Sequence, residues 1–376
     1  MTRVLVLNCG SSSLKYRIFD GDRSVDRGLV ERIGEPGGGA PDHSSALRDV
    51  LAHADLESLD VVGHRVVHGG ADFTGPTVVD DEVVAAIERL VPLAPLHNPA
   101  NLTGIAVARR LLPGVPQVAV FDTAFHATLP PAAATYAVDI DVARRLQIRR
   151  YGFHGTSHAY VARHTARLLG RPPEGLDLIT LHLGNGASAC AVSGGRSVAT
   201  SMGLSPLAGL VMGTRSGDLD PAVLFHLHRV GGLPVDAIDD LLNHRSGLLG
   251  LTGDNDMRAV LRRRAAGDPA AGLAFDVYCR RIKEYVGAYL AVLGRLDAVT
   301  FTGGVGENAA AVRAAALAGL EGLGIVVDPE RNERAGSVIS PPTAPVAVCV
   351  VPTDEEREIA EQAQTALSGQ PNPSGS

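Results

Sequence analysis

The chain has almost no lysine and no concentrated positive charge. Only Lys15 and Lys283 occur among 34 basic residues, so arginine carries nearly all of the positive charge. The net charge is −7 and no cluster of five or more basic residues is present, which argues against nucleic acid or an anionic membrane as a partner. An anionic ligand must therefore be held by individual, locally placed groups, and the rarity of lysine draws attention to Lys15.

Paired cysteines and long apolar runs are also absent. Cys9, Cys190, Cys279 and Cys349 lie far apart and form no Cys-x-x-Cys pair, which predicts buried free thiols in a reducing compartment. Only four apolar residues precede Asn8, too few for a signal peptide, and no window of 18 apolar residues could span a membrane. We therefore expect a cytoplasmic protein.

Length and composition indicate a globular chain of two domains. The residues are 45% hydrophobic and 20% charged, an ordinary composition for a folded protein. A chain of 376 residues is too long for a single core. We place the main boundary near residue 150, giving domains at 1–150 and 151–358. Residues 369–376 are rich in Pro, Gly and Ser and are expected to form a disordered tail.

Residues 4–19 read as a hairpin with a small polar turn. A continuous apolar run comes first, and Leu14, Tyr16 and Ile18 alternate with charged residues after the turn, as in two paired strands. The turn combines Gly10, three serines and Lys15, so its amides, hydroxyls and single cation suit a phosphate group. A solvent-exposed serine-rich hairpin is the alternative interpretation.

A second hairpin resembles the first. Strands are predicted at 177–183 and 189–192 around the turn 184–188, and residues 194–198 repeat the pattern of residues 21–25 at an offset of 173 residues. The repeat predicts a duplicated fold with two phosphate-facing turns, although so short a match also arises by chance.

Two charged residues lie in or just after predicted strands. Arg65 lies inside the strand 60–67, where a charge is costly unless an anion or carboxylate meets it. The strand 116–121 is followed directly by Asp122, at the edge where open α/β sheets bind ligands. Helices are expected at 98–112, 159–169, 270–293 and 354–367, and a glycine-rich loop is expected at 243–253.

Further candidates lie in turns. The glycine-rich segment 303–308 follows a predicted strand and precedes a helix, so it could hold a phosphate or a purine, although glycines that pack a strand on a helix would look the same. Arg215 lies in a glycine-flanked loop, which favours a functional role. The histidines in turns or at strand ends are His97, His126, His154, His158 and His182. None makes an i, i+4 metal pair with a nearby carboxylate, so zinc is not expected.

Seven segments together resemble the successive signatures of the acetate kinase family. They are residues 8–15, 63–70, 121–126, 151–158, 182–186, 212–218 and 303–308. The resemblance runs from about residue 3 to 362. It implies an α/β fold with a duplicated ribonuclease-H-like (actin-like ATPase) core and two domains with an interdomain active-site cleft. It also implies that a C-terminal helix at about 359–368 completes the N-terminal domain, and that the protein is a homodimer.

The resemblance further implies roles for individual residues. Asn8 and Glu355 would organise Mg2+, with Mn2+ as a substitute. The catalytic residues would be Asp122, His154, Arg215 and Arg65. The acyl group would be bound by Arg65, Val67, Leu96, Phe153 and Pro206. The nucleotide would be bound by Lys15, His182, Leu183, Gly184, Asn185, Gly186, Asp256, Met257, Arg258, Gly304, Val305, Gly306, Glu307 and Asn308.

The implied reaction is reversible phosphoryl transfer from ATP to acetate, giving acetyl phosphate and ADP. A carboxylate is a nucleophile at neutral pH, so the site needs charge neutralisation and in-line alignment more than a base. Asp122 is then better suited to ordering the metal and its waters than to abstracting a proton. Three residues depart from the family pattern: Asp354 replaces Asn, Ala199 replaces Asp and Ala208 replaces Glu. The alternatives are a propionate or butyrate kinase, or a non-kinase ATPase of the same superfamily.

Overall fold

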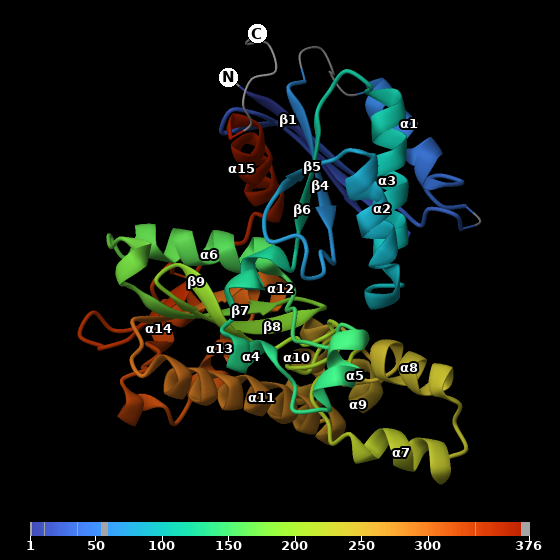
Figure 1. The fold of residues 1–376 in the computed structure, drawn as a ribbon. Coiled ribbons are helices and arrows are strands. Elements are labelled where there is room, and N and C mark those ends of the chain that lie inside the picture. Colours follow the sequence, from blue (N-terminus) through green and yellow to red (C-terminus); the bar gives the residue numbers. More distant parts are fainter. Residues whose placement is uncertain (1, 11, 36, 54–58, 335, 370–376) are drawn as a thin grey trace. The chain divides into compact units, whose positions relative to one another are not determined.

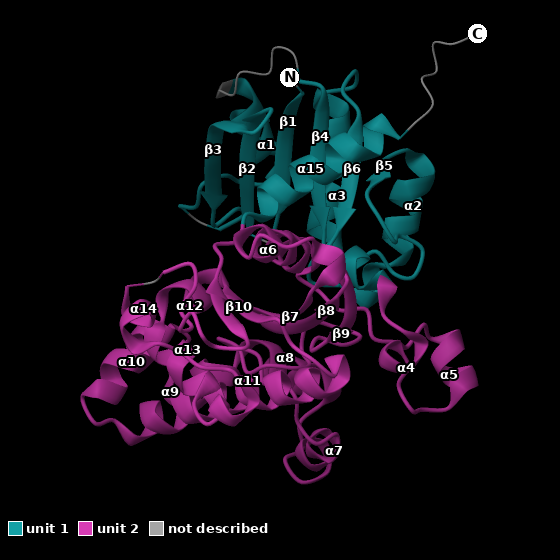
Figure 2. Cartoon of the chain, turned by 90° about the vertical axis from the view of Figure 1, so that its left-hand side faces the viewer, with its two compact units in different colours: residues 1–127, 354–376 teal, residues 128–353 magenta. Residues whose placement is uncertain are grey.

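The computed structural model describes residues 2–10, 12–35, 37–53, 59–334 and 336–369. The chain forms two compact units, residues 1–127 with 354–376 and residues 128–353 (Figure 2). We call them unit 1 and unit 2. Ser11 of the predicted serine turn and residues 370–376 of the predicted tail lie outside the described residues.

Unit 1 is built on a six-stranded sheet of order β3-β2-β1-β4-β6-β5 (Figure 2). Strand β1 pairs antiparallel with β2 and parallel with β4, and β4 pairs parallel with β6. The strands are β1 (Arg3–Cys9), β2 (Ser13–Asp20), β3 (Arg23–Glu31), β4 (Val61–Val66), β5 (Thr77–Val78) and β6 (Gln117–Phe121). The carboxyl ends of β1, β4 and β6 therefore share one edge of the sheet.

Helices cover both faces of this sheet (Figure 1). They are α1 (His43–His53), α2 (Asp81–Arg89), α3 (Asn98–Leu111) and α15 (Glu355–Ser368), with short 3-10 helices η1 (Val91–Leu93) and η2 (Ala124–Thr128). Alternate residues of β1 explain the two layers: Leu5 and Leu7 pack toward α1 and α3, whereas Val4 and Val6 pack toward Ile359 of α15. This alternation follows from the two-residue period of a strand.

Unit 2 is built on a five-stranded sheet of order β11-β10-β7-β8-β9. Its strands are β7 (Asp177–Leu183), β8 (Ala187–Ser193), β9 (Arg196–Thr200), β10 (Ala298–Thr302) and β11 (Ala347–Val350). Strands β7, β8 and β9 form an antiparallel meander, and β10 pairs parallel with both β7 and β11. The order 9-8-7-10-11 repeats the order 3-2-1-4-6 of unit 1.

The long helices α6 (Gly155–Leu168) and α11 (Pro269–Leu293) lie on opposite faces of the second sheet (Figure 1). The remaining helices of unit 2 are α4 (Pro131–Ala134), α5 (Ile140–Arg145), η3 (Pro173–Gly175), α7 (Ala222–Arg229), α8 (Val235–His244), α9 (Gly247–Thr252), α10 (Met257–Ala265), α12 (Gly303–Asn308), α13 (Ala310–Leu317), η4 (Glu321–Leu323) and α14 (Pro329–Glu333). Asp268 caps α11 by accepting from two amides, and Gly294 ends it with a φ of 74°. No helix among the described residues is long and apolar enough to cross a membrane.

The duplicated hairpin predicted from sequence is confirmed in detail. A register shift occurs between Ile18 and Phe19 where β2 pairs with β3, and between Ala191 and Val192 where β8 pairs with β9, again 173 residues apart. Gly21 and Gly194, at equivalent turns, have φ values of 54° and 55°. Positive φ values favour glycine at both turns.

The domain boundary lies earlier than the predicted one. The division falls at 127/128 and not at 150/151, because the segment before residue 150 is bound to unit 2. Arg150 Nη1 donates to the Thr200 carbonyl, and Tyr136 Oη accepts from the Leu204 amide.

Two local predictions were wrong. The expected glycine-rich loop at 243–253 contains the end of α8 and all of α9, because Leu248 is buried and Gly253 can end the helix with a φ of 77°. Helix α6 begins at Gly155, before the predicted start. His158 is therefore a helical residue and not part of a turn.

The four cysteines are buried free thiols, as predicted. Burial raises the pKa of each thiol to about 12. A thiol with so high a pKa is mostly protonated at neutral pH and reacts slowly.

Replacing Ile359 with Ala should lower the free energy of unfolding by about 2–5 kcal/mol, the usual cost of emptying an aliphatic core position. Ile359 is 1% exposed and packs with Val6 and Val118 on one face of the first sheet. Urea denaturation measures the change, and Thr365→Ala on the exposed side of α15 is the control. Equal stability of the two variants would show that α15 contributes little to unit 1.

Candidate functional site

A charged cluster lies at the carboxyl edge of the first sheet. Arg65 of β4 donates from Nε to Asp122 Oδ1 at 3.0 Å and from Nη2 to Asp122 Oδ2 at 2.6 Å. Its Nη1 makes a longer contact of 3.4 Å with Asn8 Oδ1 at the end of β1. Asp122 is thus the carboxylate that was expected to balance the charge of Arg65 inside the strand. Of the guanidinium nitrogens, Nη1 makes only the weakest contact.

Electrostatics within this cluster follow from burial. Burial raises the pKa of Asp122 above its ordinary value, and the Arg65 guanidinium opposes the shift. Burial alone would lower the pKa of Arg65, but Asp122, Glu355 and Glu356 together raise it. His97, which precedes α3, also acts to lower the pKa of Asp122. Sequence analysis listed this histidine but did not predict that it lies near the carboxylate.

The start of α15 carries three consecutive carboxylates with different surroundings. Asp354 accepts from Arg17 at 2.7 Å and caps the helix by accepting from the Arg357 amide at 3.1 Å. Glu356 pairs with Lys15 at 2.5 Å. Glu355 lies close enough to Arg65 and Asp122 to affect both of their pKa values. Asp354, which departs from the family pattern, therefore has structural partners. Glu355 and Glu356 both affect the pKa of Arg65, and Glu355 also affects that of Asp122.

His154 marks the corresponding site in unit 2. It precedes α6 with a φ of 57°, a left-handed conformation that a histidine adopts only when its surroundings hold it. Its Nδ1 lies 2.9 Å from Ser188 Oγ, and its ring stacks on that of His182 at 4.4 Å between centroids.

Gly186 keeps open a small space beside His154. A Cβ atom at this position would lie 3.3 Å from His154 Nε2 and 3.5 Å from Arg215 Nη1. Two nitrogens that can carry hydrogen therefore approach the same point. The absence of a side chain at Gly186 leaves room there for part of an anionic ligand.

Arg215 makes no ion pair with a carboxylate of the described residues. Its Nη1 donates to the Pro206 carbonyl at 3.1 Å and contacts Met212 Sδ at 3.7 Å. Burial lowers the pKa of this guanidinium. A partly buried cation without a carboxylate is costly unless a ligand supplies the negative charge.

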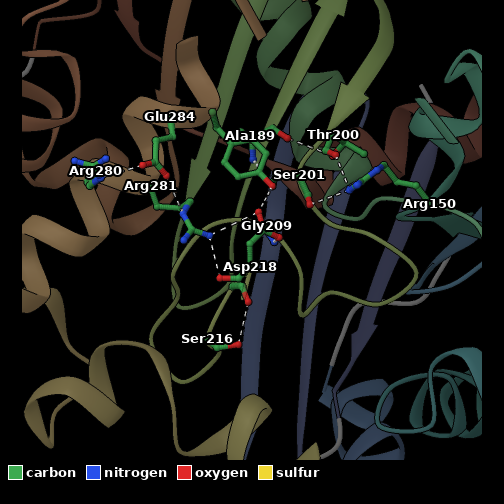
Figure 3. Close-up of polar contacts among 12 residues, drawn as sticks. Arg150, Ala189, Thr200, Ser201, Gly209, Ser216, Asp218, Arg280, Arg281 and Glu284 are labelled. Carbon is green, nitrogen blue, oxygen red and sulfur yellow. Dashed lines mark hydrogen bonds and ion pairs between the residues drawn. The ribbon is translucent and has the colours of Figure 1, made fainter. Parts of the chain in front are cut away.

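Polar contacts anchor the chain at Thr200 and Ser201 and again at Gly209 and Asp218 (Figure 3). Arg150 Nη1 lies within 3.1 Å of the carbonyl oxygens of Thr200, Ser201 and Met202. Asp218 accepts from the Gly209 amide at 2.7 Å and from Tyr285 Oη at 2.5 Å. These contacts hold both ends of the segment that contains Pro206 and Arg215.

A cavity of about 810 Å³ opens beside Gly184 and Asn185. Pockets of this volume are typical of nucleotide-sized ligands. Eight predicted nucleotide-binding residues line it: Gly184, Asn185, Asp256, Met257, Arg258, Gly304, Val305 and Asn308. Five further lining residues were missed by sequence reasoning: Leu248, Asn255, Leu261, Tyr278 and Ala309. They belong to helices or helix ends whose meeting no local motif reveals.

The other predicted nucleotide-binding residues have different surroundings. His182 Nδ1 contacts Ser157 Oγ at 2.8 Å, and Leu183 and Gly306 are buried. Glu307 accepts from the Gly303 amide at 2.9 Å and from the Thr353 amide at 3.2 Å. These residues do not line the cavity.

The predicted acyl pocket draws its residues from both units. Val67 and Leu96 belong to unit 1, whereas Phe153 and Pro206 belong to unit 2. Val67 and Phe153 are buried, at 7% and 1% exposure, but Leu96 is 49% exposed. The acyl pocket therefore stays a prediction.

The chain has two sheets with the same order of their shared strands, and polar groups lie at the hairpin of each sheet. It therefore has the duplicated fold of the actin-like ATPases. A family model described as "Acetokinase family" matches residues 38–361. The chain belongs to the acetokinase family.

Individual relatives agree with this assignment. The chain is 60% identical to the acetate kinase of Streptomyces avermitilis, over 96% of each chain. It resembles the crystal structure of Porphyromonas gingivalis acetate kinase, with a TM-score of 0.92, 42% identity and coverage of 98% of this chain and 100% of that chain. A propionate kinase from Francisella tularensis subsp. tularensis has the same TM-score at 39% identity, with coverage of 97% and 100%.

Replacing Gly186 with Ala should reduce kcat by about 10²-fold, the effect of displacing reacting groups by about an ångström. Gly186 has no positive φ, so alanine is allowed by the backbone, but its methyl group would press on His154 and Arg215. Steady-state kinetics measure the loss. The matched control is Gly175→Ala, where a Cβ meets nothing within 4 Å, and an equal effect at both positions would contradict the role of this space.

Proposed function

We propose that the protein catalyses reversible transfer of the γ-phosphoryl group of ATP to acetate, giving acetyl phosphate and ADP. The observation that carries the proposal is the convergence of His154 Nε2 and Arg215 Nη1 on the open space at Gly186. Gly184 and Asn185 of the same turn line the cavity suited to a nucleotide. Membership of the acetokinase family supports the same reaction.

The proposed mechanism assigns one substrate to each unit. In unit 1, Nη1 of Arg65 binds the carboxylate of acetate, while the other nitrogens stay engaged by Asp122. In unit 2, the cavity holds ATP with its γ-phosphate toward Gly186. One acetate oxygen attacks the γ-phosphorus in line, and the bond from that phosphorus to the bridging oxygen of ADP breaks. His154 and Arg215 donate hydrogen bonds to the transferring group, which carries the charge that catalysis must stabilise.

No strong base is required, because the attacking carboxylate is already ionised. Asp122 is bound on both oxygens by Arg65, so it is better suited to orienting that arginine and nearby water than to removing a proton. Lys15 is half-exposed and pairs with Glu356. We propose that it leaves this ion pair and binds the phosphates of the nucleotide.

The family acts with ATP and a divalent metal, and we propose Mg2+ with Mn2+ as a substitute. Asn8 and Glu355 offer the oxygen donors that a hard cation prefers, and Mg2+ usually binds through one or two such groups plus water and phosphate. No group of three or more His, Cys, Asp or Glu side chains among the described residues could hold a metal alone. This pattern fits an ion that binds together with the nucleotide. When bound, the ion would neutralise phosphate charge.

We further propose a cytoplasmic homodimer. The absence of a membrane-crossing helix among the described residues is compatible with that location. Unit 2 exposes large apolar side chains at Phe225, Val230 and Val235, with exposures of 56%, 73% and 73%. We propose that these side chains contribute to the dimer interface, since contiguous exposed apolar surface marks protein interfaces.

Trapping the acyl phosphate with hydroxylamine tests the activity. Formate, acetate, propionate and butyrate are each supplied with ATP, and the hydroxamate is measured. Acetate should give the highest kcat/KM, because an apolar pocket rejects each extra methylene by roughly 10- to 200-fold. A preference for propionate would instead favour the alternative activity, that of a propionate kinase. ATP hydrolysis that is independent of any carboxylate would instead indicate a non-kinase ATPase.

Replacing Arg215 with Ala should lower kcat by about 10³-fold, as for arginines that meet a transferring phosphoryl group. ATP affinity should change by only a few-fold, and Lys should restore little activity because it lacks the planar fork. Kinetics and nucleotide titration measure the two effects. Arg245→Ala, at an exposed pair with Asp240, is the control, and a loss confined to ATP affinity would contradict the proposed role.

Replacing Glu355 with Gln should raise the Mg2+ concentration for half-maximal rate, since one anionic oxygen is removed from a hard-cation site. Asp354→Asn is the matched control, because Asp354 is engaged by Arg17 and the helix cap. Activity measured across a Mg2+ titration distinguishes the two variants. An unchanged requirement in Glu355→Gln would remove Glu355 from the metal site.

A further inference from the structure

A row of buried polar side chains lies behind His154. Ser188 Oγ lies 2.9 Å from His154 Nδ1 and 2.8 Å from His158 Nε2. His158 Nδ1 lies 2.7 Å from Thr180 Oγ1. Ser188, His158 and Thr180 are each 0% exposed, so water does not compete for these contacts.

The spacing of the two histidines along the chain and the pairing of β7 with β8 bring these side chains together. His154 and His158 are four residues apart at the start of α6, so their side chains lie one turn apart on the same face. Ser188 in β8 and Thr180 in β7 lie on neighbouring strands of the sheet beneath this helix. The Ser188 hydroxyl lies between the two rings and contacts both of them.

Counting protons limits the possible arrangements. A serine hydroxyl has one hydrogen, so Ser188 donates to one histidine and accepts from the other. Ser188 and Thr180 have no other side-chain hydrogen-bond partner within the part of the chain that the structure describes. The direction of each bond therefore determines the direction of the next.

One direction leaves a buried donor unused. If His154 Nδ1 carried the hydrogen, Ser188 would donate to His158 Nε2, and His158 Nδ1–H would donate to Thr180. The Thr180 hydroxyl hydrogen would then be buried without an acceptor, which is unfavourable. In the opposite direction Thr180 donates to His158 Nδ1, His158 Nε2–H donates to Ser188, and Ser188 donates to His154 Nδ1. Every donor from Thr180 to Ser188 is then used, and the His154 Nε2 hydrogen faces the space at Gly186.

We propose that Ser188, supported by His158 and Thr180, is a positioning residue that holds His154 as the neutral tautomer with hydrogen on Nε2. That nitrogen faces the space at Gly186, where a hydrogen-bond donor can meet a phosphoryl oxygen. The other neutral tautomer would present a lone pair to the anion and repel it. The inference rests on the proposed role of His154 in phosphoryl transfer.

The charged and titratable groups around His154 agree with a neutral ring. His182 stacks on it from β7, His158 lies behind Ser188, and Arg215 approaches from the 212–218 loop. A second positive charge on His154 would be repelled by the guanidinium of Arg215. The ring therefore acts as a neutral donor beside a permanent cation.

Nitrogen-15 NMR of histidine-labelled wild-type protein tests the tautomer without any need for activity. Long-range coupling spectra distinguish a ring nitrogen that carries hydrogen from one that does not, and loss of one signal set in His154→Ala assigns His154. We expect hydrogen on Nε2 and a bare Nδ1 near pH 7.5. Hydrogen on Nδ1 alone, or on both nitrogens, would overturn the proposal.

Variants of Ser188 test whether the tautomer of His154 affects kcat. Ser188→Ala should shift His154 toward a mixture of tautomers and lower kcat by about 10- to 100-fold, the usual effect of removing a group that orients an active-site histidine. The KM for ATP should stay within about two-fold, because ground-state binding is retained. Ser188→Thr keeps the hydroxyl and should recover most of the rate. Ser197→Ala removes an equally buried hydroxyl that contacts Cys190, and it should leave both the tautomer and kcat unchanged.

The outcomes separate this inference from the proposed function. Wild-type kcat in His154→Ala would overturn the role of His154 in transfer, whatever its tautomer. A Ser188→Ala protein with unchanged NMR signals and unchanged kcat would overturn the positioning role alone. If Ser188→Ala does not fold, the wild-type spectrum still decides the tautomer.

Discussion

The register between β7 and β8 is the constraint on which the unit 2 site depends. It places His182 opposite Ser188 and Thr180 opposite Cys190. A shift of one residue would turn Ser188 to the other face of the sheet, away from His154 and His158. The same register places Gly186 in the turn, where a missing side chain leaves room beside His154 and Arg215. One strand pairing therefore sets both the open space and the groups that face it.

Duplication explains why each unit has its site at the same place. In unit 1 the equivalent hairpin pairs Asn8 with Lys15, and in unit 2 it pairs His182 with Ser188. The offset of 173 residues between the two second strands makes Ser188 the counterpart of Lys15. The same backbone position thus carries a half-exposed cation paired with Glu356 in one unit and a buried hydroxyl in the other. The fold provides the position, and the local chemistry decides its use.

Local patterns allowed most of the fold to be predicted, and physical reasons explain the exceptions. The hairpins, the strand before Asp122 and the helix after Asp268 have clear periodicity or caps. The boundary at 127/128 was missed because it depends on contacts between distant residues, such as Arg150 with the carbonyls of residues 200–202. The cavity wall formed by Leu248 and Tyr278 was missed for the same reason. Neither residue has a neighbour in sequence that signals a ligand.

The two arginines of the proposed site differ in how their charge is balanced, and the difference suits their proposed tasks. Arg65 is bound by Asp122 through Nε and Nη2, so its plane is held in place and Nη1 is directed away from the pair. A substrate carboxylate can then bind at one edge without displacing Asp122. Arg215 instead rests on the Pro206 carbonyl, a neutral acceptor that orients the guanidinium without cancelling its charge. Because charge on the transferring phosphoryl group is what the site must stabilise, the uncompensated arginine belongs beside that group. The compensated arginine can hold a smaller anion in a fixed direction, which is what alignment of the acceptor requires.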